Sequence, residues 1–154
     1  MKSTAIDCSS LREVLVTASA GLLFAIAANP ASGADWAASL QNLTPVQGRT
    51  LLALARDFFQ HPELSDSHYT VCIDPYDTAA ADPQAKASLE ESMELVKGAS
   101  RRMGYDSYAE ISDEYERLRL SKMLAEGRWL RQFKKSVGQC LYDQPDVKTR
   151  LNRN

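Results

Sequence analysis

The feature that most constrains this chain is a run of fifteen residues, Val14 to Ala28, without a charge in a sequence otherwise charged at ordinary density. Its large apolar side chains are Val14, Leu15, Val16, Leu22, Leu23, Phe24 and Ile26. Burying them all is worth on the order of 10 kcal/mol, comparable to the stability of a whole domain. The run is too short to span a bilayer core, which needs about 20 residues. We therefore expect it either to be removed or to be buried against another protein.

The surroundings of this run resemble an export signal. Pro30 ends the run, and the small residues up to Ala34 are typical of a signal-peptide cleavage site. The segment also resembles a twin-arginine export signal, with Leu11 in place of the first arginine of the pair. We accordingly divide the chain into a twin-arginine-like apolar segment, retained or cleaved, a helical domain and a tail: 1–34, 35–147 and 148–154.

The composition predicts one globular domain. The 154 residues are 44% apolar and 25% charged, which is ordinary for a soluble protein of this size. The formal net charge is −2 and the isoelectric point is near 5.7, so the chain as a whole offers no positive field to nucleic acid. We expect neither a nucleic-acid partner nor a membrane span.

Three cysteines, Cys8, Cys72 and Cys140, share no short spacing. Because no Cys-x-x-Cys pair exists, a thioredoxin motif, a c-type haem attachment site and a zinc knuckle are excluded. The odd number means that at least one thiol is left over or bonds another chain. The ordinary expectation for each cysteine is a small, buried apolar side chain.

The first helix of the body is predicted after Thr44. Thr44 as N-cap, Pro45 at the first helical position and Gln47 at the third form a capping-box pattern. Pro62 should end the helix. The predicted buried stripe consists of Val46, Leu51, Leu54, Ala55, Phe58 and Phe59.

Two further helices follow. A short one should begin at Ser65 or Asp66 and stop at Pro75. The next begins at the cap and proline pair Asp82-Pro83 and should end at Gly104. Its predicted buried face consists of Leu89, Met93, Val96 and Met103.

The C-terminal part reads as a turn at 105–112 and helical segments on either side of a break at Gly127. Before the break, the predicted stripe is Tyr115, Leu118 and Met123; after it, Trp129, Leu130, Phe133, Val137 and Leu141. No segment shows strand alternation. The fold class is therefore all-α, a small irregular helical bundle with an apolar N-terminal helical segment.

No catalytic, cofactor-binding or metal-binding residues are predicted. The glycines never take the G-x-G-x-x-G spacing of a dinucleotide site. Asp57 and His61 lie four residues apart and could share a metal ion, but two ligands do not close a site. Cys72 and His68 share the same spacing but show no orienting third group, so we expect a structural role there as well.

Two stretches resemble the gluconate 2-dehydrogenase small (gamma) subunit family. The first motif, residues 61–69, follows an apolar helix and consists of His61-Pro62, Leu64, Asp66 and Tyr69. The family usually has proline before histidine, so the order of this first pair is reversed here. The second motif, residues 141–147, is similar to the family's closing Leu-Tyr-x-x-Pro-x-Val and consists of Leu141, Tyr142, Pro145 and Val147.

This resemblance implies a non-catalytic helical subunit that supports the folding, stability or export of a large flavoprotein. The large subunit would be a glucose-methanol-choline-type dehydrogenase that carries FAD and oxidises an alcohol group, with a cytochrome c-type subunit in some complexes. We expect no cofactor in this chain itself. The expected compartment is the cytoplasm if the N-terminal segment is retained, and the periplasm if the chain is exported with the large subunit.

The apolar segment and the closing helix supply the predicted partner contacts. The expected interface residues are Val14, Leu15, Leu22, Leu23, Phe24, Trp129, Phe133 and Tyr142. Packing in the chain's own core is the alternative for the last three. The alternative for the whole protein is an exported, stand-alone helical binding domain with a cleaved signal peptide.

Overall fold

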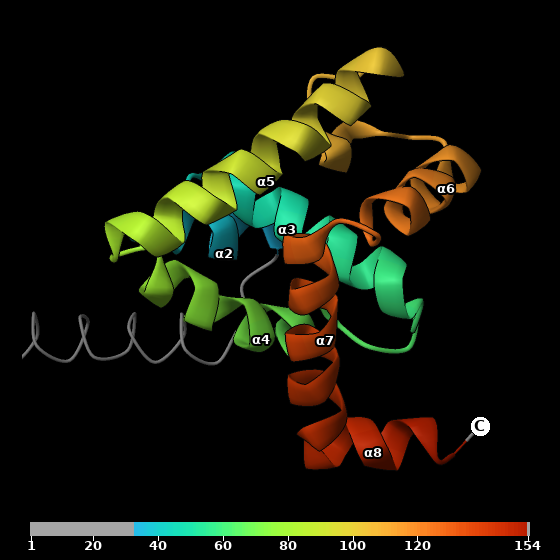
Figure 1. Cartoon of the computed structure of the whole chain (residues 1–154). Helices are drawn as coiled ribbons and strands as arrows, with labels where there is room; N and C mark the ends of the chain where they lie inside the picture. The colour runs from blue at the N-terminus through green and yellow to red at the C-terminus, as the bar shows by residue number, and fades with distance from the viewer. Residues whose placement is uncertain (1–32, 154) are drawn as a thin grey trace, which may run out of the picture. The chain divides into compact units, whose positions relative to one another are not determined.

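The computed structural model describes residues 33–153 and confirms the all-α fold class, since this part of the chain forms helices and no strand (Figure 1). The helices are α2 (Gly33–Ser39), α3 (Pro45–Phe59), α4 (Asp66–Ala79), α5 (Pro83–Arg102), η1 (Tyr108–Glu110), α6 (Glu114–Leu124), α7 (Arg128–Asp143) and α8 (Pro145–Leu151). None of them is long and apolar enough to cross a membrane. The predictions for Val14 to Ala28, including the five interface residues there, concern residues outside the described part.

Helix α3 lies at the centre of the bundle, in contact with α2, α4, α6, α7 and η1 (Figure 1). Its start confirms the predicted capping box: the Thr44 hydroxyl accepts from the Gln47 N–H, and the Gln47 side chain accepts from the Thr44 N–H. The prediction that Val46 is buried is wrong. Val46 is 51% exposed, because it lies in the first turn, before the helix enters the core.

Helix α4 continues through Pro75 to Ala79, so the prediction that Pro75 stops it is wrong. A proline removes one N–H donor and leaves the carbonyl four residues earlier without its usual partner. Pro75 and Val71 are both exposed, so water can reach that carbonyl group. The proline is thus tolerated because it lies on the outer side of the helix.

Helix α5 matches its prediction closely. The Asp82 carboxylate accepts from the Ala85 N–H at the start, and Gly104, with φ of +89°, follows the end. Leu89, Met93 and Val96 are buried, and Met103 packs against the core.

Helix α6 uses a different face from the predicted one. Tyr115 and Met123, expected to be buried, are 75% and 65% exposed. The face turned inward instead carries Arg117, Leu120 and Ser121. The apolar spacing was misleading here because an ion pair with α3, rather than an apolar stripe, orients the helix.

Helix α7 confirms its predicted core face, with Leu130, Phe133, Val137 and Leu141 buried. Phe133 lies in an aromatic cluster with Trp129 and Tyr76 at ring-centroid distances of 5.6 and 5.1 Å. The helix then turns into α8, whose Val147 is fully buried. The boundary drawn before residue 148 from the sequence therefore falls inside α8.

Candidate functional site

The two motifs that carry the family resemblance meet in space. His61 Nε2 and the Tyr142 hydroxyl share a hydrogen bond of 2.9 Å across 81 residues of sequence. The two ring centroids lie 5.8 Å apart in an edge-to-face geometry, and Phe59 contacts Tyr142 in a similar geometry at 5.9 Å. These side chains join the end of α3 to the end of α7, and Tyr142 remains 40% exposed.

The apolar members of both motifs are core residues. Leu64 and Tyr69 of the first motif and Leu141 and Val147 of the second are at most 1% exposed. Their role in the folded chain is therefore to close the junction of α3, α4, α7 and α8 from the inside.

A disulfide bond lies beside this junction. Cys72 of α4 and Cys140 of α7 are bonded, 68 residues apart in sequence, with a Cα–Cα distance of 5.6 Å. The sequence left the cysteine pairing open, because nothing local relates Cys72 to Cys140. The bond also rules out a nucleophilic role for Cys72, since a disulfide sulfur has no thiolate to offer.

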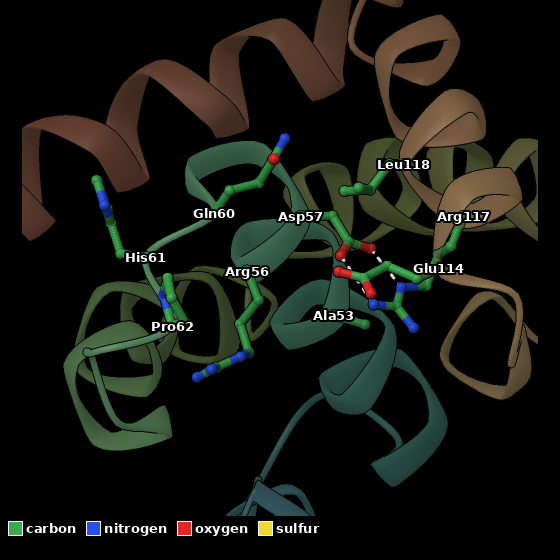
Figure 2. Close-up of a pocket in the computed structure, with 9 residues that line it drawn as sticks. All are labelled: Ala53, Arg56, Asp57, Gln60, His61, Pro62, Glu114, Arg117 and Leu118. Carbon is green, nitrogen blue, oxygen red and sulfur yellow. Dashed lines mark hydrogen bonds and ion pairs between the residues drawn. The ribbon is translucent and has the colours of Figure 1, made fainter.

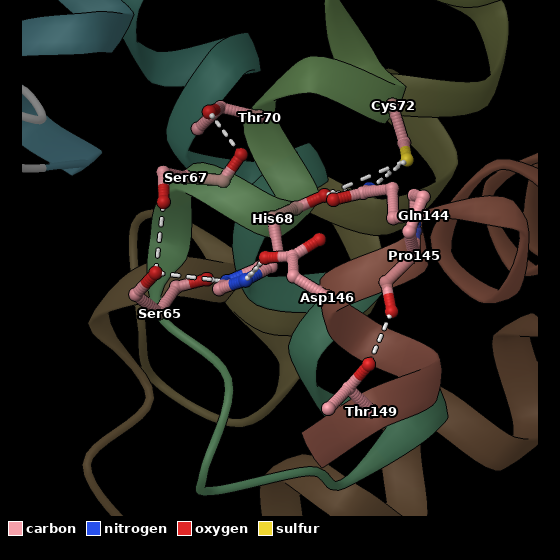
Figure 3. Close-up of polar contacts among 9 residues, drawn as sticks. All are labelled: Ser65, Ser67, His68, Thr70, Cys72, Gln144, Pro145, Asp146 and Thr149. Atoms are coloured by element: carbon pink, nitrogen blue, oxygen red, sulfur yellow. Dashed lines mark hydrogen bonds and ion pairs between the residues drawn. The ribbon is translucent and has the colours of Figure 1, made fainter. Parts of the chain in front are cut away.

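His68 ties α4 to α8 through a chain of polar contacts (Figure 3). Its Nε2 lies 2.7 Å from Asp146 Oδ2, and its Nδ1 lies 2.8 Å from the Ser65 hydroxyl and 3.3 Å from the Ser65 carbonyl oxygen. The Gln144 amide donates to the His68 carbonyl oxygen at 2.8 Å. The hydrogen bond from His68 holds the pKa of Asp146 below its usual value.

This serine, histidine and aspartate arrangement superficially resembles a hydrolytic triad, but its surroundings differ. The Ser65 hydroxyl is also 2.8 Å from the Ser67 hydroxyl, and the larger cavities of residues 33–153 are lined by other side chains. None of these cavities places a substrate carbonyl against Ser65. The arrangement therefore acts as a structural tie between helices that are distant in sequence.

A cavity of about 510 Å³ lies between α3 and α6 (Figure 2). It is lined by Ala53, Arg56, Asp57, Gln60, His61, Pro62, Glu114, Arg117 and Leu118. On one side, Arg117 donates to both carboxylate oxygens of Asp57, at 2.8 and 3.2 Å. The Tyr108 hydroxyl donates to the same carboxylate at 2.7 Å.

Two pKa shifts reflect this pairing. Burial and the hydrogen bond to Asp57 raise the pKa of Tyr108 above its usual value. The hydrogen bond to Asp57 likewise raises the pKa of Arg117. Tyr108 is therefore a fixed hydroxyl donor, and Arg117 a fixed cation, at any physiological pH.

Arg56, another charged side chain of the cavity, is also engaged. It donates to Asp66 at 2.7 Å and to the Leu64 carbonyl at 3.2 Å, and its guanidinium lies 5.3 Å from the ring centre of Tyr69. The first motif is thus held to α3 by one arginine. The cation is used to fix the loop after α3 rather than to bind a ligand.

The structure does not bring Asp57 and His61 together as a metal pair. Asp57 is occupied by Arg117 and Tyr108, and His61 by Tyr142. No group of three or more potential metal ligands occurs among residues 33–153. Sequence reasoning missed the Asp57–Arg117 pair, because its members lie 60 residues apart.

The three predicted interface residues of α7 occupy different environments. Phe133 is completely buried in the chain's own core, and Trp129 stacks on it and is partly covered. Tyr142 alone of the three is classed as exposed. Of these side chains, Tyr142 is the one whose surface a partner can reach directly.

No protein-family model, curated protein or solved structure matches this chain.

Proposed function

We propose that this chain is the non-catalytic small subunit of a heteromeric FAD-dependent alcohol or sugar dehydrogenase, in which it supports the folding, stability or export of the large flavoprotein subunit. One observation carries the proposal most strongly. The two motifs that resemble the small-subunit family lie about 80 residues apart and yet pack against each other through His61 and Tyr142. This contact supports treating the two motifs as parts of one unit.

The state of the charged groups favours a binding role over catalysis. Around the cavity between α3 and α6, Asp57 is paired with Arg117, and Arg56 with Asp66. A catalytic site instead needs acid, base or nucleophilic groups that converge on a space where a substrate can react. FAD and the acid–base chemistry of alcohol oxidation are accordingly assigned to the large subunit.

The disulfide supports work in an oxidising compartment. Disulfides such as Cys72–Cys140 persist in secreted and periplasmic proteins and are rare in the reducing cytoplasm. Of the two compartments that the sequence leaves open, the periplasm is therefore the one we propose, with export alongside the large subunit.

Co-purification of a tagged full-length chain from its native source tests this function. We expect a second polypeptide of flavoprotein size, the absorbance spectrum of an oxidised flavin, and bleaching of that spectrum by an alcohol or sugar substrate. The isolated small chain should bind no flavin. A tagged chain that purifies alone, while the alcohol-oxidising activity of the same extract stays in other fractions, would contradict the proposal.

The second candidate is an exported, stand-alone helical binding domain. The same disulfide favours it, because a cross-linked domain of this size can be stable without a partner. Intact-mass analysis separates the two. A monomer that begins at Asp35 would support the stand-alone domain, whereas a complex with a flavoprotein would exclude it.

A further inference from the structure

The net charge of −2 conceals a strong asymmetry along the chain. Residues 33–116 carry 15 Asp and Glu against 6 Lys and Arg, whereas residues 117–153 carry 10 Lys and Arg against 3 Asp and Glu. The formal net charges of these two parts are therefore −9 and +7. A chain that is unremarkable as a whole thus has a strongly basic C-terminal part, which can attract an acidic partner.

Helix α7 presents three of these ten cations on one face. Its other face is apolar and packs into the chain's own core. Arg128, Arg131 and Lys135, spaced three and four residues apart, are all exposed on the same side of the helix. The helix has no carboxylate before its last residue. Within residues 33–153, Arg131 is the only one of the three cations with an ion pair, to the carboxylate of Glu126 at 3.4 Å.

An aromatic side chain lies at the end of this face. Tyr142 is 40% exposed and is held by Phe59 and His61, so its ring is already oriented before any partner arrives. Tyrosine and arginine are the residues most often found as anchors in protein interfaces. From Arg128 to Tyr142 the helix extends about 21 Å, a length suited to a protein–protein contact.

We propose that this face of α7, from Arg128 to Tyr142, docks on a carboxylate-rich surface of a different protein chain. The identity of that chain rests on the function proposed above, in which it is the large flavoprotein subunit. The cations steer the two chains together and fix their register, and Tyr142 inserts at one end.

A protein surface fits the charge pattern better than a membrane or a nucleic acid does. A nucleic acid and an anionic membrane are both extended and negative throughout, so they would repel the acidic residues 33–116, whereas a protein can carry a local acidic patch. Membrane binding would also require a row of exposed apolar side chains. Tyr142 is the only large apolar side chain of α7 that is classed as exposed.

Charge reversal on α7 tests the proposal in the full-length chain, co-expressed with the large subunit. The test variant carries Arg128→Glu, Arg131→Glu and Lys135→Glu. The matched control carries Lys86→Glu, Arg101→Glu and Arg102→Glu, which reverse three exposed cations on α5 and change the net charge equally. Circular dichroism and thermal unfolding establish that both variants are folded.

We expect the α7 variant to retain about ten-fold less flavoprotein, and the control to match wild type within about two-fold. Raising the NaCl concentration should weaken the wild-type complex. A carbodiimide, which joins amines to carboxylates in contact, should cross-link Lys135 to the large subunit.

Three results would overturn the proposal. If wild type retains the flavoprotein and the α7 variant retains as much, the docking face is wrong although the proposed function stands. If wild type retains no flavoprotein, both fail. If the α7 variant keeps the flavoprotein but loses binding to phosphatidylglycerol vesicles, the face is a membrane surface.

Discussion

The double variant Cys72→Ala/Cys140→Ala tests what the bond between α4 and α7 contributes. The two helices also contact one another through other residues, so these contacts remain without the bond. The bond mainly restricts the unfolded chain, because it closes a loop over a sequence separation of 68 residues. We therefore expect the variant to keep its helices and to lose stability.

The size of the loss follows from the loop length. For a separation of 68 residues, the chain-entropy relation gives about 4 kcal/mol at room temperature. Removing the two sulfur atoms adds at most about 1 kcal/mol of lost apolar burial. With about 0.25 kcal/mol/K of unfolding entropy for residues 33–153, the unfolding midpoint should fall by about 15–20 °C.

Urea unfolding followed by circular dichroism measures the effect. Both proteins should carry Cys8→Ser, so that no third thiol can exchange with the bond during unfolding. A reductant provides the matched control. It should destabilise the parent by about as much as the two substitutions do, because the chain-entropy effect is the same, and it should leave the double variant unchanged.

The reasoning fails if the double variant and the reduced parent both unfold within about 1 kcal/mol of the oxidised parent. It also fails if thiol labelling of the unfolded parent finds Cys72 and Cys140 both free. The first result would mean that the unfolded chain is already compact around these residues. The second would mean that the bond does not form.

Four further predictions concern other parts of the molecule. Asp57→Ala should lower the free energy of unfolding by about 3 kcal/mol in urea titrations, because it leaves the partly buried Arg117 cation without its partner. The double variant Asp57→Ala/Arg117→Leu should recover part of that lost stability, since it removes the unpaired cation as well. Burial alone would raise the pKa of Asp77, but three backbone N–H donors outweigh it and lower that pKa. Its stabilising effect is thus complete above the unfolded-state pKa and lost as the pH falls through the lower folded-state value. Asp77→Asn should therefore cost about 2 kcal/mol at neutral pH and flatten the acid limb of a stability–pH curve. Trp129→Ala should cost about 3 kcal/mol in thermal unfolding, the low end of the range for a tryptophan because its side chain is only partly covered. An unchanged melting temperature with loss of the flavoprotein would show instead that Trp129 is a partner anchor. Deletion of residues 1–32, which leaves α2 in place, should preserve the unfolding transition and abolish retention of the large subunit; a truncated chain that still holds an active flavoprotein would show that the segment is only an export label.

The sequence determined the features that depend on neighbours along the chain. The capping box at Thr44, the cap at Asp82 and the stop at Gly104 all form as predicted. Each is completed by residues no more than four or five positions away, so the pattern contains everything that the interaction needs. The core face of α7 was equally predictable from the sequence, because five apolar residues repeat there at helical spacing.

The candidate site was only partly visible in this way. The two motifs were recognised separately, and Tyr142 was predicted as a partner contact, but nothing local indicated that His61 and Tyr142 would meet. The basic face of α7 was hidden by the near-neutral charge of the whole chain.

Only the tertiary structure decided the features that join distant segments. The Cys72–Cys140 bond spans 68 residues, and the Asp57–Arg117 pair 60. The second of these also decided which face of α6 turns inward, against the apolar spacing of its sequence. The physical reason is that a buried charge needs a partner of opposite charge. Which residue becomes that partner depends on how whole helices pack together, and not on the residues next to it in the sequence.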